Sequence, residues 1–144
     1  MSLHLILAAL HAWVAWRICP SLGPVWGTLF GVLLAASVIV MPLGLRARQR
    51  RGGASADLLA WAALLAMGFF SSLFVLTLAR DLALLAGLGI DALVPGGIGL
   101  GATARRSAVA VPLVAAAITL LGFAFIATRY GGIRKLRAAR REGV

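Results

Sequence analysis

Four apolar stretches, each about long enough to cross a bilayer, limit most strongly what this chain can fold into. They cover about residues 2–19, 24–45, 56–88 and 106–128. A helix needs about 20 apolar residues to cross the roughly 30 Å hydrocarbon core of a membrane. Lipid offers no partner to backbone polar groups, so such stretches cross as helices. We therefore expect an all-α integral membrane protein: a four-helix transmembrane bundle in one domain, residues 1–130, followed by a tail.

The composition supports lipid, and not water, as the solvent of these stretches. Hydrophobic residues make up 62% of the 144 residues and charged residues 12%, and the mean hydropathy is +1.01. Soluble domains are usually about 45–50% apolar and about 25% charged. The alternative, four buried helices of a soluble bundle, would show a polar face along each helix, and these stretches show none.

Proline, glycine and polar residues predict where the helices begin and end. The first helix is expected to stop at Pro20, with a tight PSLG turn over residues 20–23 that makes an antiparallel hairpin, and Ser55 is a candidate cap for the third helix. Residues 89–104 are glycine-rich and predict a loop or a re-entrant segment. Residues 131–144 are expected to leave the helix at Gly131 and Gly132 and to form a basic tail or linker.

The basic residues are divided unevenly between the two sides of the predicted bundle. One side has Arg17, Arg80, Arg105 and Arg106; the other has Arg46, Arg48, Arg50 and Arg51 in a loop, and Arg129, Arg134, Lys135, Arg137, Arg140 and Arg141 near the end. Because cytoplasmic segments carry the excess of Lys and Arg, both termini are predicted in the cytoplasm, with the chain in the inner (plasma) membrane. Except for Arg129, the residues on the richer side are candidate contacts for anionic lipid.

A net charge of +10 also raises the possibility of nucleic-acid binding. The basic residues lie beside the apolar stretches and do not form a groove-sized face, which is the usual distribution in membrane proteins. We therefore expect the lipid bilayer, and not nucleic acid, as the partner of these charges.

Two motifs concern contacts between helices. GTLFG, from Gly27 to Gly31, is a GxxxG step that lets another helix approach the second stretch closely. The third stretch contains an adjacent Arg80 and Asp81, and Arg80 lies about 34 Å from Asp57 along a straight helix, at the outer interface. Arg80 is expected to extend into the headgroups.

Asp81 has a short side chain and needs a donor nearby. Arg17 ends the first stretch at the same outer level, so we expect an interhelical ion pair between Arg17 and Asp81. Two separately solvated interfacial charges are the alternative.

Patterns for catalysis or metal binding are sparse. The acids, Asp57, Asp81, Asp91 and Glu142, lie at or beyond the ends of the stretches. His4 and His11 share one helix face about 10 Å apart, too far to share a metal. We expect His4 at the interface and His11 packed and bonded to a neighbouring helix. No catalytic, cofactor or metal site is predicted in this chain.

Four segments occur in order: HAWVAWRICP, MPLGLR, WAALLAMGFFSSLFVLTLARDLALL and TRYGG. Together they resemble the membrane-embedded N-terminal region of bacterial calcineurin-like metallophosphoesterases. The resemblance covers essentially the whole chain but consists of spans and their ends, not of a catalytic signature. In that family a phosphoesterase domain follows and binds two divalent metals through DxH, GD, GNH[DE] and GHxH motifs. None of these motifs is in this chain, so no catalytic residue is carried over.

The resemblance implies a non-catalytic membrane anchor or scaffold that holds a phosphoesterase at the inner membrane face. The sequence stops at EGV, where a linker to such a domain would begin, so a segment of a longer protein is expected. Two alternatives stay open. One is a small oligomeric carrier or channel gated by the glycine-rich residues 96–101, and the other is a lipid- or partner-binding membrane subunit.

Overall fold

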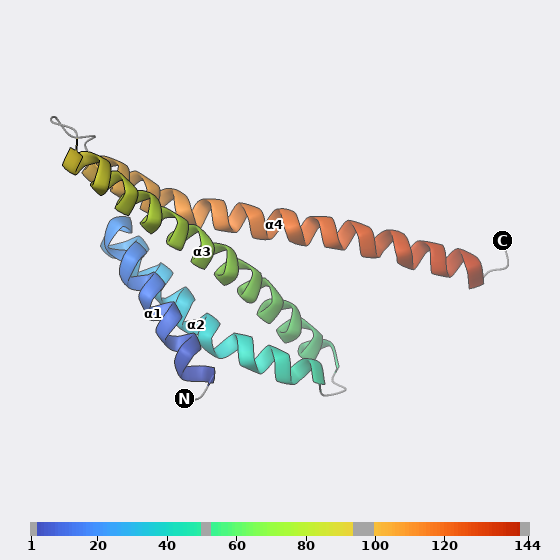
Figure 1. The fold of residues 1–144 in the computed structure, drawn as a ribbon. Coiled ribbons are helices and arrows are strands. Elements are labelled where there is room, and N and C mark those ends of the chain that lie inside the picture. Colours follow the sequence, from blue (N-terminus) through green and yellow to red (C-terminus); the bar gives the residue numbers. More distant parts are fainter. Residues whose placement is uncertain (1–2, 50–52, 94–99, 142–144) are drawn as a thin grey trace.

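A computed structural model describes residues 3–49, 53–93 and 100–141, with side chains for 4–47, 53–93, 100 and 102–129. These residues form four helices: α1 (Leu3–Leu22), α2 (Pro24–Gln49), α3 (Ala54–Leu93) and α4 (Leu100–Arg141) (Figure 1). Each contains a segment long and apolar enough to cross a membrane: His4–Leu22, Pro24–Ala47, Ala54–Leu93 and Ala102–Arg129. The predicted all-helical fold with four membrane-length helices is confirmed for the described residues.

The turn between α1 and α2 is shorter than the sequence predicts. α1 continues through Pro20 to Leu22, and Gly23 alone separates it from α2. The expected stop at Pro20 is wrong: the helix continues for two residues past the proline, close enough to its end that few helical hydrogen bonds depend on the missing N–H. Gly23 has a φ of 81°, the left-handed region that glycine adopts without strain, and its carbonyl accepts from Gly27 N at 2.8 Å.

The helix α3 begins one residue before its predicted cap. The carbonyl of Gly53 accepts from the backbone N–H groups of Ala56 at 2.9 Å and Asp57 at 3.3 Å. Ser55 is therefore inside the first turn and is not the cap. The carboxylate of Asp57 lies in that first turn, where the helix dipole favours negative charge.

The loop predicted over residues 89–104 is helical at both of its ends. Residues 89–93 belong to α3 and 100–104 to α4, while 94–99 lie outside the described residues. A glycine in a helix interior costs about 1 kcal/mol, but it also leaves space. A Cβ on Gly87 would lie 2.8 Å from a methyl group of Leu100. Because Gly87 has no side chain, α3 and α4 can pack closely here, and the packing offsets the cost of a glycine in the helix.

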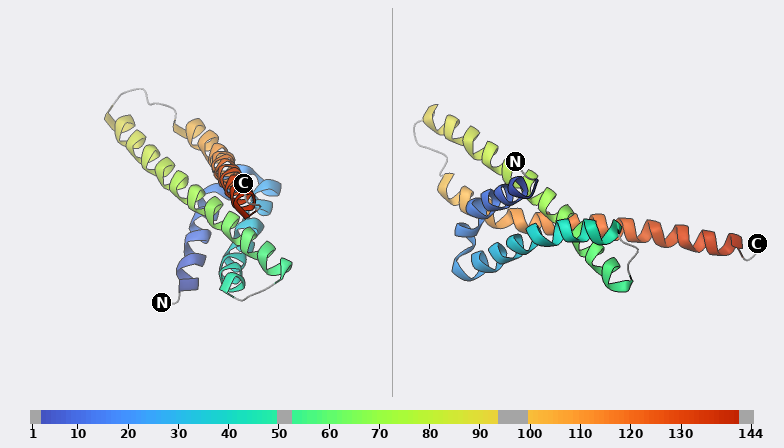
Figure 2. Two further views of the ribbon diagram at one scale, coloured as in Figure 1. Left: turned by 90° about the vertical axis from the view of Figure 1, so that its right-hand side faces the viewer. Right: turned by 90° about the horizontal axis from the view of Figure 1, so that it is seen from below.

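The helix α4 also continues where the sequence predicts a break. It runs through Gly131 and Gly132 and ends at Arg141. The residues that follow the two glycines include arginine, lysine, leucine and alanine, which favour helix. The C-terminal part of α4 extends beyond the other three helices (Figures 1 and 2).

The helices pack in two antiparallel pairs, α1 with α2 and α3 with α4, and α3 also packs along α2 (Figure 2). The tightest approach joins α2 and α3, where a Cβ on Gly44 would overlap the Cβ of Ala63. Small residues of this kind let membrane helices come together. All four helices contribute to one core, which contains Val14, Ile18, Leu34, Met41, Phe70, Leu73, Val111 and Ala115.

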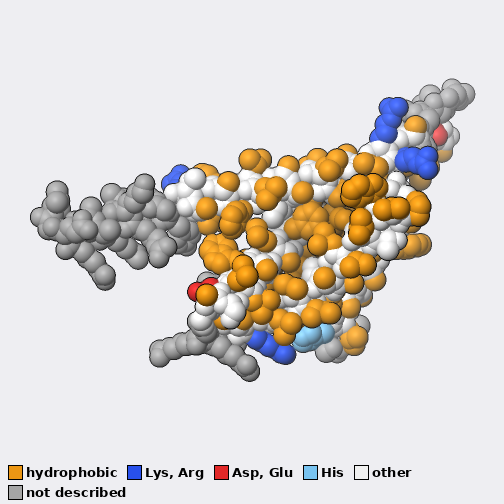
Figure 3. All heavy atoms as spheres, turned by 180° about the vertical axis from the view of Figure 1, so that it is seen from behind, with side chains coloured by type: hydrophobic (Ala, Val, Ile, Leu, Met, Phe, Trp, Pro, Cys, Tyr) orange, Lys and Arg blue, Asp and Glu red, His pale blue; other side chains and the backbone are white. Residues whose placement is uncertain are grey.

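The outer surface of the bundle is apolar. Large hydrophobic side chains such as Leu58, Leu113 and Leu121 are exposed, and hydrophobic side chains cover the flank seen in Figure 3, with basic side chains near its edges. A soluble monomer rarely exposes so large an apolar surface. A bilayer is the solvent in which this surface is stable.

Candidate functional site

A cluster of charged and polar groups joins α1, α3 and α4. We call it the polar cluster; it consists of Arg17, Arg80, Asp81, Ser107 and the carbonyl of Ala104. Arg17 Nε donates to Asp81 Oδ2 at 2.7 Å, and Arg80 Nη1 donates to Asp81 Oδ1 at 3.0 Å. The ion pair expected between Arg17 and Asp81 is thus present in the structure, and the same carboxylate holds a second arginine.

Arg80 is expected from the sequence to extend into the headgroups, but its side chain bonds to α4 instead. Its Nε donates to Ser107 Oγ at 3.1 Å and its Nη2 donates to the carbonyl of Ala104 at 2.8 Å. The Arg80 side chain is only 9% exposed, against 39% for Arg17. The expectation is wrong because α4 lies beside this part of α3 and supplies two acceptors to the guanidinium.

Arg80 and Asp81 also bind each other, in addition to their partners on other helices. Adjacent side chains leave a helix in different directions, but arginine is long and presents five donors on a planar group. Arg80 therefore reaches its neighbour and α4 at once. Ser107 and Ala104 could not be predicted as partners from the sequence, which indicates only that they lie at the same end of the bundle as Arg80.

The polar cluster stabilises one arrangement of α1, α3 and α4. One carboxylate faces two guanidinium groups, and Asp81 is 16% exposed. A buried charge that loses its partner destabilises a protein by about 3–5 kcal/mol. The cluster therefore favours one register of α1, α3 and α4 over arrangements that separate these groups.

The GxxxG step of α2 faces the other helix of its own hairpin. Gly27 is buried, and a Cβ there would lie 2.5 Å from the carbonyl oxygen of Cys19. A Cβ on Gly31 would lie 3.9 Å from Cys19 Sγ, an ordinary contact. Gly27 is thus the residue that requires glycine, and the helix that it admits is α1.

The histidines are placed differently from one another. His4 is exposed, whereas His11 is only 3% exposed and its ring stacks on Phe70 of α3, with centroids 3.5 Å apart. His11 Nδ1 lies 2.8 Å from the carbonyl of Leu7 in its own helix. The expected hydrogen bond to a neighbouring helix is therefore replaced by ring stacking, and Nε2 has no hydrogen-bond partner among the described residues.

The side chains predicted to contact anionic lipid are described only in part. Arg46 is exposed near the C-terminal end of α2. The guanidinium of Arg129, at the matching end of α4, lies 4.9 Å from the centre of the Phe125 ring. The side chains of Arg48, Arg50, Arg51, Arg134, Lys135, Arg137, Arg140 and Arg141 lie outside the described residues.

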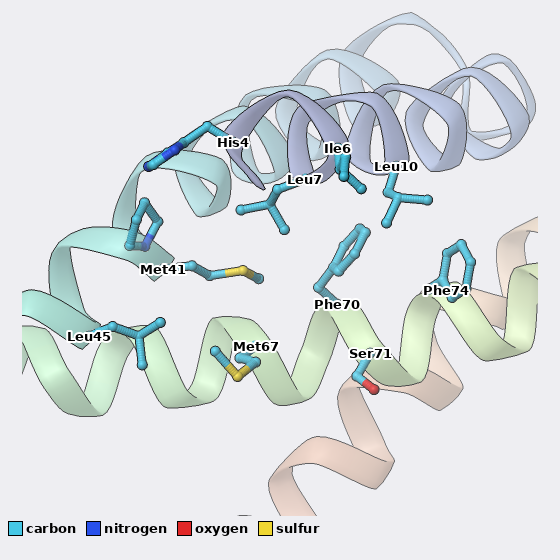
Figure 4. A pocket seen from close by; sticks show the side chains of 11 residues that line it. His4, Ile6, Leu7, Leu10, Met41, Leu45, Met67, Phe70, Ser71 and Phe74 are labelled. Atoms are coloured by element: carbon cyan, nitrogen blue, oxygen red, sulfur yellow. The ribbon is translucent and has the colours of Figure 1, made fainter. Parts of the chain in front are cut away.

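Between the helices are apolar grooves. One, which we call the α1–α3 groove, has a volume of about 390 Å³ and is lined by α1, α2 and α3 (Figure 4). A second, of about 520 Å³, lies between the α1–α2 hairpin and α4 around Trp26 and Pro112. Among the residues with described side chains, no three of His, Cys, Asp and Glu are grouped so as to hold a metal ion.

Comparison with known proteins gave no match: no family model, no curated protein and no solved structure is similar to this chain. The likeness to metallophosphoesterase membrane regions therefore rests on the quoted sequence segments alone.

Proposed function

We propose that this chain is a non-catalytic membrane anchor that holds a phosphoesterase domain at the cytoplasmic face of the inner membrane. The observation that carries the proposal is the length of α4. The apolar sequence of α4 gives way to basic residues from Arg129 onward, yet the helix continues to Arg141. A domain that follows this helix would be held close to the membrane on the side where the basic residues gather.

The hydrogen bonds inside the bundle support a scaffold over a carrier. The hydroxyls of Ser37, Thr77 and Thr119 donate to backbone carbonyls of their own helices at 2.7, 2.7 and 2.8 Å. The charged groups of the polar cluster bond to one another. The hydroxyls are thus satisfied within their own helices and the charged groups by one another, so these polar groups are not left to bind a solute, as the polar groups of a carrier would be.

The helix count and the charges support this orientation. If all four helices cross the membrane, both termini lie on one side of it, and α2 and α4 both end on that side. The richer set of basic residues lies at those same helix ends, and cytoplasmic segments carry this excess. The exposed Trp16 and Trp26, both near the α1–α2 turn, are suited to the opposite interface.

A pair of reporter fusions tests the anchor and its orientation. Green fluorescent protein joined after Val144 should fluoresce and remain with the membrane after alkaline carbonate extraction. Alkaline phosphatase at the same junction should be inactive, because it folds only outside the cytoplasm. The opposite pair of results would reject the cytoplasmic placement, and release of the fusion by carbonate would reject the anchor.

The phosphoesterase part of the proposal has a separate test. The reading frame that follows the codon for Val144 in the gene should encode a domain with DxH and GNH[DE] motifs. A stop codon directly after Val144 would leave a membrane scaffold and remove the attached enzyme from the proposal.

A further inference from the structure

The α1–α3 groove is a feature that the anchor function does not use. Its walls are apolar side chains from three helices, among them Leu7, Leu10, Met41, Met67 and Phe70. Figure 4 shows these side chains pointing into a common space between α1 and α3, with α2 closing one end. The polar residues that line it are His4, at that end, and Ser71.

The groove runs along the axes of α1 and α3. It extends from His4 to Leu10 on α1 and from Met67 to Phe74 on α3, which corresponds to about 9–10 Å at 1.5 Å per residue. The His4 end is the end at which α1 begins and α2 finishes. The groove therefore opens beside the interface and continues toward the middle of the bundle.

The volume of the groove limits what it can hold. The groove has about 390 Å³. A single lipid acyl chain is much narrower than a helix. In a bilayer, acyl chains surround this part of the protein.

The interface end of the groove carries positive charge. Arg46 directly follows Leu45, which lines the groove, and it lies four residues after Pro42, which also lines it. Residues four apart share a helix face, so Arg46 lies on the face of α2 that lines the groove, one turn beyond Pro42. His4, which lines the groove at the same end, is exposed.

We propose that the α1–α3 groove binds one anionic phospholipid, with an acyl chain between α1 and α3 and the phosphate beside Arg46 and His4. An acyl chain that enters the groove leaves one hydrocarbon environment for another. The acyl chain therefore packs into the groove but contributes little to the preference for one lipid over another. Selectivity comes from the headgroup charge. The site goes beyond the anchor function, and in the orientation proposed above it lies in the inner leaflet.

Native mass spectrometry of the purified chain in detergent tests this site without reference to orientation or to any attached enzyme. The probes are phosphatidylglycerol and phosphatidylcholine with identical acyl chains. One phosphatidylglycerol should bind, about fivefold more tightly than phosphatidylcholine, because a basic residue near anionic lipid contributes about that factor. Equal binding of the two lipids would overturn the proposal.

Arg46→Gln should remove the preference for phosphatidylglycerol. The matched control is Arg129→Gln, which removes the same charge at the same end of the bundle but on α4, away from the groove. It should leave the preference unchanged. If both variants weaken phosphatidylglycerol binding equally, the effect belongs to the net charge and the proposed site is wrong.

Ser71→Phe should fill the groove and reduce binding of both lipids at least tenfold. Val75→Phe, one turn further along α3 at an exposed position outside the groove, is its control and should bind as the wild type does. Met67→Trp, also at an exposed lining position, replaces Ser71→Phe if that variant fails to fold. Undiminished binding in the blocked variants would overturn the proposal, as would a wild-type dimer that the blocked variants lose.

Discussion

Loss of Arg17 and loss of Asp81 should destabilise the bundle to very different extents, although the two side chains bind each other. The Arg80 side chain is 9% exposed and the Arg17 side chain 39%. A half-exposed ion pair contributes about 1 kcal/mol or less, so Arg17→Gln should lower the free energy of unfolding by about that amount. Asp81→Asn leaves Arg80 buried without a carboxylate, and breaking a buried pair costs about 3–5 kcal/mol.

The loss for Asp81→Asn should lie near the lower end of that range, about 3 kcal/mol, because Arg80 keeps two acceptors on α4. Those acceptors are the hydroxyl of Ser107 and the carbonyl of Ala104. In the double variant, Arg17→Gln should cost almost nothing further, since its partner is already gone. The expected coupling energy between residues 17 and 81 is therefore about 1 kcal/mol.

The measurement is the free energy of unfolding in mixed micelles, followed by tryptophan fluorescence as sodium dodecyl sulfate is added. Arg105→Gln, at an exposed position near the same end of α4, is the matched control and should change stability by less than about 0.5 kcal/mol. Losses that add within about 0.3 kcal/mol would show that residues 17 and 81 do not interact. An Arg17→Gln loss larger than that of Asp81→Asn would refute the reasoning from burial.

Three further predictions follow from the structure. Gly44→Ala should destabilise the bundle by about 1–3 kcal/mol, because its methyl group would overlap Ala63, whereas Gly122→Ala, where a Cβ meets nothing within 4 Å, should be neutral or stabilising in the same unfolding assay. In a Cys19→Ala background, Ser21→Cys should react with an impermeant maleimide added to intact cells and Ser55→Cys should not; the reverse pattern would invert the proposed orientation. The purified chain should neither hydrolyse a generic phosphodiester nor retain a stoichiometric transition metal, and turnover that survives repurification and rises with added manganese would contradict this.

The number and kind of the helices could be predicted because hydrophobic length is a local property of the sequence. The residues at which the helices begin and end could not be predicted in this way. Pro20, Gly89 and Gly131 each suggest an end, and each carries a local cost of a few kcal/mol at most. Near the α3–α4 connection, contacts between helices such as Leu100 against Gly87 offset that cost, and these contacts depend on the tertiary structure. Past Gly131, the helix-favouring residues that follow offset it.

The pairing of Arg17 with Asp81 could be anticipated because the topology places both at one level and Asp81 needs a donor. The partners of Arg80 could not, since they depend on which face α4 turns toward α3. The sequence carries little information on that rotation, because α4 is apolar on all sides between Ser107 and Thr119. For the same reason the α1–α3 groove was not foreseen: it results from the spacing of three helices, not from any motif.

The unequal lengths of α1 and α3 have a consequence for the surrounding lipid. α1 has 20 residues and α3 has 40, which correspond to about 30 Å and about 60 Å. A bilayer core of about 30 Å matches α1 but is half the length of α3. Such hydrophobic mismatch costs a fraction of a kcal/mol per Å and is relieved by helix tilt or by local thickening of the bilayer. α3 must therefore tilt within the bilayer, thicken the lipid around it or continue past the interface beyond Arg80, whereas α1 spans the core without any of these.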